Sequence, residues 1–121
     1  MTRIREVRSN SARVMKRFGL INRLRPEALQ LYKECHQSVW PGVLALITRC
    51  NIRNYSIYQK DGYLFAYFEY HGTDYKRDMD KMARCPTMRR WWSIMEPMQD
   101  PLETRAEGEW WADMEEVFHL D

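Results

Sequence analysis

Residues 54–70 read NYSIYQKDGYLFAYFEY, and this stretch decides the fold. Two runs rich in aromatic side chains, 54–58 and 63–70, flank the Asp61-Gly62 pair. Aspartate followed by glycine favours a two-residue hairpin turn, because both residues tolerate positive φ. Alternate residues of the second run point to opposite faces, and both faces carry large apolar side chains. The stretch therefore predicts a β-hairpin whose two faces are both covered.

Before this hairpin the pattern predicts one strand and two helical segments. Phe18, Leu20 and Leu24 favour a strand over residues 17–24. Pro26 suits the first turn of a helix over 26–39. Pro41-Gly42 would break that helix before a second helical piece at 43–49. The expected core stripe of the first helix consists of Ala28, Leu31, Cys35 and Val39.

After the hairpin, helix signals return. We expect a helix over residues 74–84 with Thr73 as its N-cap, and another over 88–95 capped by Thr87. A loop over 97–112 and a last strand over 115–120 complete the chain. The order β-α-β-β-α-β is the ferredoxin-like arrangement of α+β proteins. Its sheet carries helices on one face, and a second subunit is the simplest cover for the other face.

Composition narrows the class of protein. The 121 residues suffice for one domain, 45% of them are hydrophobic and 30% charged, and the net charge is +2. This balance gives no electrostatic case for nucleic acid or a membrane surface, and no apolar run is long enough to span a bilayer. The charge is uneven, since residues 1–16 are strongly basic. We interpret these residues as a flexible tail, with an organellar transit peptide as the main alternative, and place the domain at 17–121.

Few motifs support metal or cofactor chemistry. Cys35, Cys50 and Cys85 are odd in number and widely spaced, which favours free thiols in an intracellular protein and predicts a cytoplasmic location. The sequence has no CxxC pair, no HExxH, no glycine-rich phosphate loop and no GxSxG motif. We therefore expect no cofactor and no metal.

One histidine stands out as an acid–base candidate. Tyr32, His36 and Trp40 lie at i, i+4 and i+8, so the first two share a helix face. Histidine exchanges a proton near neutral pH, although a histidine in such a place is more often structural. The Arg90-Trp91-Trp92 segment adds two indoles that diverge on their helix. Aromatic faces with hydroxyl and indole N–H groups suit a neutral, hydroxyl-rich ligand such as a sugar.

These segments resemble the L-rhamnose mutarotase family. The matching stretches occur in the family's order and cover about residues 17–121. They are Tyr32-x-x-x-His36-x-x-x-Trp40-Pro41, Asn54-Tyr55-x-Ile57-Tyr58, Leu64-Phe65-Ala66, Arg90-Trp91-Trp92 and Glu116-Val117-Phe118-x-Leu120. The resemblance implies a dimeric α+β barrel and a homodimer. It also implies a cofactor-free isomerase that interconverts the α and β anomers of L-rhamnose or a related deoxy-sugar.

The resemblance also implies roles for individual residues. His36 matches the family's proton donor, and the substrate-binding positions match Tyr32, Tyr55, Trp91 and Trp92. The catalytic base is left open between Tyr32, Tyr55 and a water molecule. The chain departs from the family pattern at Gln37-Ser38, where Asn-Pro is usual, and at Gly42, where the carboxylate that usually follows Trp-Pro is missing. His119 stands where the family commonly has tyrosine. Two other functions remain as alternatives: a cofactor-independent monooxygenase of the same fold, and a non-catalytic sugar-binding module.

Overall fold

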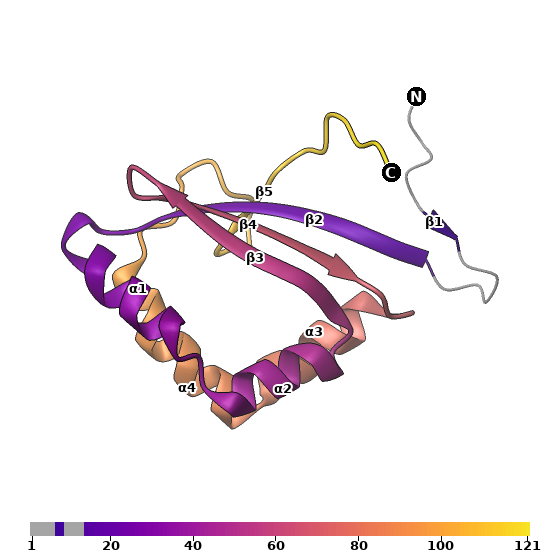
Figure 1. The fold of residues 1–121 in the computed structure, drawn as a ribbon, viewed down its shortest axis with the longest axis horizontal. Coiled ribbons are helices and arrows are strands. Elements are labelled where there is room, and N and C mark those ends of the chain that lie inside the picture. The colour runs from indigo at the N-terminus through magenta and orange to yellow at the C-terminus, as the bar shows by residue number, and fades with distance from the viewer. Residues whose placement is uncertain (1–6, 9–13) are drawn as a thin grey trace.

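The computed structural model describes residues 7–8 and 14–121, and in that part it shows an α+β fold with one sheet and four α-helices (Figure 1). Much of the expected tail at 1–16 lies outside the described residues, although the long first strand of the domain already begins at Val14. The elements are β1 (Val7–Arg8), β2 (Val14–Arg23), η1 (Pro26–Ala28), α1 (Leu29–Gln37), α2 (Pro41–Arg49), β3 (Ile52–Lys60), β4 (Tyr63–Tyr70), α3 (Tyr75–Arg84), α4 (Pro86–Met95), η2 (Glu96–Met98) and β5 (Ala112–Asp113).

The sheet confirms the predicted topology. Its order is β5-β2-β4-β3, with every pair antiparallel, which is the strand order of a ferredoxin-like fold. β2 is the central long strand, since β4 pairs with it from Lys16 to Arg23 while β5 pairs with it only at Leu20 and Ile21. β1 adds a short pairing at the start of β2.

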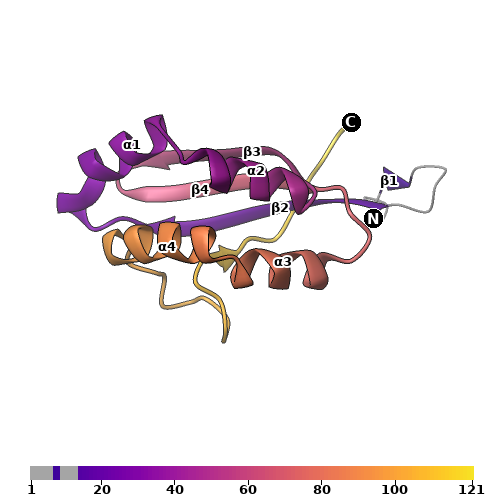
Figure 2. The same ribbon diagram turned by 90° about the horizontal axis from the view of Figure 1, so that it is seen from below.

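All four α-helices lie on one side of the sheet (Figures 1 and 2). In Figure 2, α1 and α2 run along β3 and β4, while α3 and α4 run below β2. The main core therefore forms between sheet and helices, and its fully buried members include Val43 of α2 and Leu64 of β4. In the part of the chain that the structure describes, no helix covers the opposite face of the sheet, and the segment after β5 lies over only the part of it near Arg17 and Tyr67.

The hairpin forms as its sequence predicts. Asp61 has φ 55° and Gly62 has φ 85°, and the turn places Lys60 opposite Tyr63. Along β4 the residues with even numbers are buried against the helices, while Tyr63 and Phe65 are exposed on the other face. The expected division of this strand into two apolar faces is confirmed.

The first helical segment is broken earlier than predicted. The helix expected over residues 26–39 consists of η1 and α1 and ends at Gln37. Trp40 is extended, at φ −58° and ψ 135°, because a residue before proline avoids the helical region, and Pro41 itself then starts α2. The predicted core stripe is wrong at Leu31, which is 53% exposed, whereas Tyr32 is buried.

Three further predictions need correction. The N-cap of α3 is Asp74 rather than Thr73, and its side chain accepts a hydrogen bond from the Arg77 N–H at 3.1 Å. α4 begins at Pro86, so Thr87 lies inside the helix. Residues 115–120 form no strand. After the Met114 N–H bonds to Gly19 O at 2.8 Å, no strand among the described residues pairs with the segment that follows.

The described residues contain no helix with both the length and the apolar character needed to cross a bilayer. Within the same residues, no group of three His, Cys, Asp or Glu side chains is arranged to hold a metal ion.

Candidate active site

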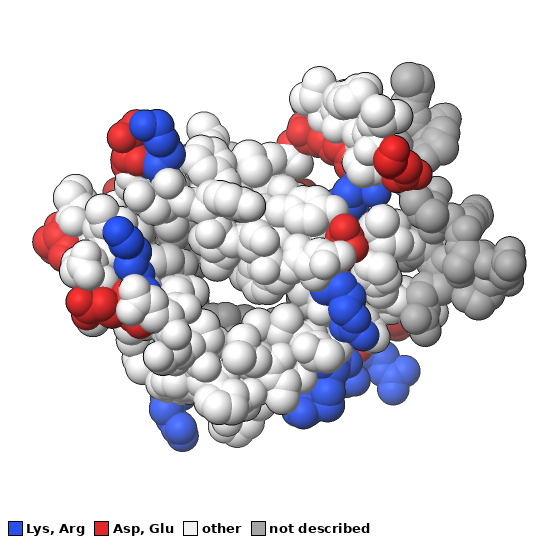
Figure 3. All heavy atoms as spheres, in the orientation of Figure 1, with Lys and Arg blue, Asp and Glu red and all other residues white. Residues whose placement is uncertain are grey.

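A cavity lies between the sheet and the helices. It consists of two adjoining pockets of about 310 Å³ and 370 Å³, which share Tyr32, His36, Tyr55 and Trp91 in their walls. In the space-filling view a hollow opens between the sheet and the helices, and the atoms around it belong mostly to uncharged residues (Figure 3). The site is therefore suited to a small neutral ligand with both apolar and hydroxyl surfaces.

The structure brings together all five residues that the sequence singled out. Tyr32 and His36 come from α1, Tyr55 from β3, and Trp91 and Trp92 from α4, and all five line the first pocket. The other two histidines lie elsewhere, since His71 faces Glu69 and His119 faces Asp121. His36 is therefore the histidine that the fold places in the cavity wall.

One hydrogen bond fixes the orientation of His36. Its Nδ1 lies 2.9 Å from the backbone carbonyl oxygen of Tyr32, one helical turn earlier. A carbonyl oxygen only accepts, so Nδ1 carries a hydrogen and donates it. This leaves Nε2 as the nitrogen that gains or loses a proton. The Tyr32 ring packs on the same imidazole at 4.3 Å between centroids.

Trp91 packs directly against this histidine in the cavity wall. Its ring meets His36 edge-on at 5.5 Å and Trp40 edge-on at 5.2 Å, and the residue is 7% exposed. Trp92 is half-buried and lines the same pocket from the next position of α4. The two adjacent indoles therefore form different parts of the wall rather than a stack, as expected from their divergence on a helix.

A β-bulge turns Tyr55 toward the cavity. Arg53 pairs with Glu69 and Ser56 with Tyr67, so Asn54 and Tyr55 together oppose Phe68. Asn54 adopts a φ of 51°, a conformation that asparagine tolerates better than most residues. The extra residue changes which side chains face inward.

The result is that Tyr55 lies on the helix side, with its ring edge-on to Phe68 at 5.5 Å. Ile57 lines the cavity from the same strand.

Comparison with known proteins identifies the family. The sequence matches the model of the L-rhamnose mutarotase family over residues 17–120. The chain belongs to this family. An L-rhamnose mutarotase of Oceanobacillus iheyensis is 30% identical over 88% of the chain and 100% of its own length. One of Bacillus subtilis is 32% identical with the same coverage. The names of these relatives are those of a carbohydrate isomerase.

A solved structure supports the fold independently. The crystal structure of an L-rhamnose mutarotase from Formosa agariphila superimposes with a TM-score of 0.67 and 23% sequence identity, covering 88% of this chain and 99% of the other. At this identity the likeness establishes the fold. The α+β architecture of the L-rhamnose mutarotase family is thus found in this chain by both sequence and structure.

The cavity tyrosines of this family member keep their hydroxyl hydrogens at neutral pH. Burial raises the pKa of Tyr32 well above its usual range, and burial raises the pKa of Tyr55 to about 12. Tyr55 nevertheless has 44% of its surface exposed, because its ring borders the open cavity. Both hydroxyls are therefore protonated at neutral pH and can donate to a ligand oxygen.

Sequence reasoning missed one wall of the cavity. Glu96, Gln99, Trp110 and Trp111 line the first pocket, and they come from η2 and the loop that follows it. The loop was predicted, but its contribution to the site was not. The Trp110-Trp111 doublet was visible in the composition, yet loop residues have no periodicity that indicates where their side chains point.

Proposed function

We propose that this chain interconverts the α and β anomers of L-rhamnose in the cavity between sheet and helices, with His36 as the proton donor. The observation that carries this proposal is the bond between His36 Nδ1–H and Tyr32 O at 2.9 Å. It holds the imidazole so that the opposite nitrogen, Nε2, is the one available for proton exchange. Membership of the L-rhamnose mutarotase family supplies the substrate.

The reaction needs one acid and one base. In the opening step, protonated Nε2 of His36 gives its proton to the ring oxygen while the bond between that oxygen and C1 breaks. The hydroxyl on C1 loses its proton to a base and becomes the aldehyde carbonyl. Rotation about the C1–C2 bond presents the other face of the carbonyl, and the reverse proton transfers close the ring. Each proton given up is returned, so the reaction is balanced without a redox partner.

The tyrosines act as donors in this scheme rather than as the base. Burial raises the pKa of both Tyr32 and Tyr55, so the tyrosinate forms are scarce at neutral pH. The sequence left three candidates for the base, Tyr32, Tyr55 and a water molecule, and only the water molecule remains. We assign the base role to a water molecule, and Glu96 in the cavity wall provides a carboxylate that can take the proton from it.

The mixed wall suits a deoxy-sugar. Indole faces pack against C–H groups and against the methyl group of a 6-deoxy-sugar, and phenol hydroxyls donate to ring hydroxyls. Trp91 and Trp92 supply the apolar surface, and Tyr32 and Tyr55 supply the donors. The four residues thus form the proposed binding set around His36.

Anomer-exchange NMR on L-rhamnose tests the function. We expect the wild-type protein to speed α/β exchange above the buffer rate, and His36→Gln to lower the enzyme rate by about 10²–10⁴-fold while sugar binding is kept. His119→Gln is the matched control, since His119 lies outside the cavity against Asp121. Sugar binding with exchange at the buffer rate would instead indicate a binding module, and oxygen uptake with an aromatic substrate would indicate a monooxygenase.

We also propose that the chain works as a homodimer through the outer face of the sheet. Tyr58 is 69% exposed, and Tyr63 and Phe65 are 40% and 36% exposed on that face. In the extended C-terminal segment, Val117 and Phe118 are 90% and 79% exposed. A second copy of the chain would cover both sets of apolar side chains. Sedimentation at micromolar concentration should give a dimer, and a strictly monomeric profile would refute it.

The domain boundary and location are proposals of the same kind. We propose that residues 17–121 form the catalytic domain and that the residues before β2 are dispensable for exchange. A chain that starts at Val14 keeps all of β2 and should retain full activity.

The three free cysteines support a location in the cytoplasm, where thiols stay reduced. Cell fractionation tests this, and recovery in an organelle would favour a targeting role for the basic leader.

A further inference from the structure

A chain of two hydrogen bonds connects the loop to the proposed substrate site. Trp110 Nε1 lies 2.7 Å from Gln99 Oε1, and Gln99 Nε2 lies 3.4 Å from the hydroxyl oxygen of Tyr32. Gln99 is 3% exposed, so its amide is removed from solvent. A buried amide is held firmly only when both of its ends have partners, and here both have them.

The donor properties of indole settle the direction of each bond. The Trp110 N–H can only donate, so the atom of Gln99 that faces it must be the carbonyl oxygen. The amide nitrogen of Gln99 must then face Tyr32, and it can only donate. The Tyr32 hydroxyl is therefore the acceptor in this contact. Its own hydrogen points elsewhere, and among the described residues it has no protein acceptor.

We propose that Gln99 is a positioning residue: with Trp110, it forces Tyr32 to accept from the protein and so to donate its proton to a sugar oxygen in the cavity. The inference rests on the proposed mutarotase function and adds the group that sets the polarity of the site. It also gives Trp110 a role in orienting the site. Trp111 is not needed for it.

The fold fixes the position of Gln99 from both sides. The Arg25 N–H bonds to Met98 O at 2.9 Å, and the Asp100 N–H bonds to Arg23 O at 2.9 Å. These bonds hold the residues on either side of Gln99 against the end of β2.

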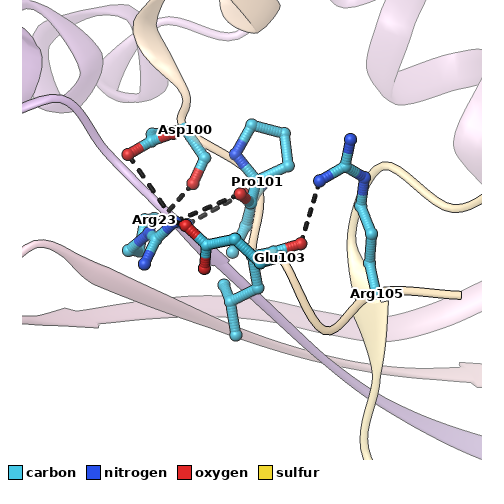
Figure 4. A network of polar contacts seen from close by, with 7 residues as sticks. Arg23, Asp100, Pro101, Glu103 and Arg105 are labelled. Atoms are coloured by element: carbon cyan, nitrogen blue, oxygen red, sulfur yellow. Dashed lines mark hydrogen bonds and ion pairs between the residues drawn. The ribbon is translucent and has the colours of Figure 1, made fainter.

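The Arg23 guanidinium adds further bonds to the same segment (Figure 4). Its Nε donates to Asp100 O at 3.1 Å, and its Nη2 contacts Pro101 O and Glu103 Oε2 at 3.2 Å each. The amide of Gln99 therefore projects into the cavity wall from an anchored backbone, which is what a positioning residue requires.

The Gln99→Glu variant distinguishes a positioning role from a merely structural one, because only a positioning role predicts that the effect on the exchange rate depends on pH. When its carboxyl is protonated, one oxygen accepts from Trp110 and the O–H donates to Tyr32, as in the wild type. When it is ionised, both oxygens accept, and Tyr32 must donate to the carboxylate instead of to the sugar. The ratio of variant to wild-type exchange rate should therefore fall at least about tenfold between pH 5 and pH 8. His36 and Glu96 face the same cavity, so the same pH series is measured for a variant at this position that carries no carboxyl group.

Gln99→Met is the matched variant, because it keeps the length of the side chain and removes both bonds. The exchange rate of Gln99→Met should be lower than that of the wild type by a smaller factor than for ionised Gln99→Glu, and this factor should not depend on pH. Trp110→Phe should behave in the same way and leaves Gln99 in place. The proposal is overturned if Gln99→Glu has a ratio that is constant with pH, whether close to one or equal to that of Gln99→Met.

A measurement without sugar separates this inference from the proposed function. The ¹³Cζ resonance of Tyr32 reports whether its hydroxyl donates or accepts. In Gln99→Glu we expect this resonance to move further between pH 5 and pH 8 than it does in the wild type, where the His36 ring packs on Tyr32. If the wild type fails to speed exchange but the resonance moves, the mutarotase proposal fails and the hydrogen-bond chain stands. A fixed resonance in the variant overturns the inference even if the wild type is active.

Discussion

The two faces of the sheet have similar side chains and opposite surroundings. On the helix side of β4, Leu64 and Phe68 are 1% and 6% exposed, whereas Tyr63 and Phe65 on the other side are 40% and 36% exposed. The inner face is covered by four helices of the same chain and contributes to the cavity. The outer face has no helix over it within the described residues, and the C-terminal segment after β5 covers only the part near Arg17 and Tyr67. Aromatic content alone therefore does not distinguish a core face from an interface face. What distinguishes them is what packs against each face.

Two hydrogen bonds from tyrosine to a carboxylate show the same difference between the inner and outer faces. On the inner face the Tyr70 hydroxyl donates to Asp78 Oδ2 at 2.6 Å, and this bond ties the end of β4 to α3. On the outer face the Tyr67 hydroxyl donates to Glu69 Oε2 at 2.8 Å, two residues along the same strand. The first bond connects two elements and the second connects none, so we expect only the first to contribute much to the stability of a single chain.

The largest effect is expected from a charge on the outer face. Phe65→Glu would place two carboxylates in the proposed dimer interface, which costs several kcal/mol and weakens the dimer by about a hundredfold or more. Sedimentation should then show a monomer at micromolar concentration. Leu31→Glu is the matched control, since Leu31 is 53% exposed on α1 in the helix layer. If both variants stay dimeric, the outer face is not the interface.

The next effect contrasts burial on the two faces. Leu64→Ala should lower the free energy of unfolding by about 2–5 kcal/mol, because it removes a fully buried side chain and leaves a cavity. Tyr58→Ala, on the exposed face, should change it by less than about 0.5 kcal/mol. Urea unfolding of both in the Phe65→Glu background compares single chains. Equal losses would show that the outer face is as well packed as the inner one.

A third, smaller effect concerns Asp78 and depends on pH. Desolvation alone would raise the pKa of Asp78, but hydrogen bonds from Tyr70 and Asn51 and the charge of Lys81 hold it below its usual value. A carboxylate with a depressed pKa stabilises the fold fully above its unfolded pKa, and this contribution is lost as the pH falls through the folded value.

Asp78→Asn should therefore cost about 1–3 kcal/mol at pH 7 and progressively less below about pH 4. Glu69→Gln is the outer-face counterpart and should have a smaller effect in the monomeric background. Unfolding curves between pH 2 and pH 7 provide the measurement. A loss for Asp78→Asn that does not shrink in acid would contradict the assignment.

The sequence predicts the features that depend on neighbouring residues better than those that depend on distant ones. The hairpin, the strand order and the inward and outward faces of β4 follow from local patterns, because turn chemistry and period two act over a few residues. The spacing of Tyr32 and His36 predicts that they share a face, and the fold shows it. The first helix ends at Gln37 rather than at residue 39 as predicted. Pro41 keeps Trp40 out of the helical region and itself begins the next helix.

Local patterns fail where contacts are distant in sequence. Gln99 reaches Tyr32 across 67 positions, and the loop between η2 and β5 has no repeat that reveals this contact. Tyr70 reaches Asp78 only after the chain has turned from sheet to helix, so a buried aspartate on α3 was not anticipated. Tyr55 was predicted from a family motif, whereas its inward direction depends on a bulge. Long-range polar partners are thus the part of the site that a single sequence does not display.

The smallest expected effect tests that bulge directly. Tyr55 and Tyr58 lie three residues apart on β3. Tyr58 pairs with the outward-facing Phe65 and borders only the second pocket, whereas Tyr55 lines both pockets. The bulge at Asn54 decides that Tyr55 lies on the helix side, because a change of register by one residue exchanges the faces. Tyr55→Phe should weaken L-rhamnose binding by about 2–10-fold, the value of one neutral hydrogen bond. Tyr63→Phe should leave binding unchanged, because Tyr63 lies on the outer face of β4 and lines neither pocket. NMR titration measures both. A larger loss for Tyr63→Phe would mean that the sugar sits on the outer side of the sheet, and the assignment of the two faces would have to be reversed.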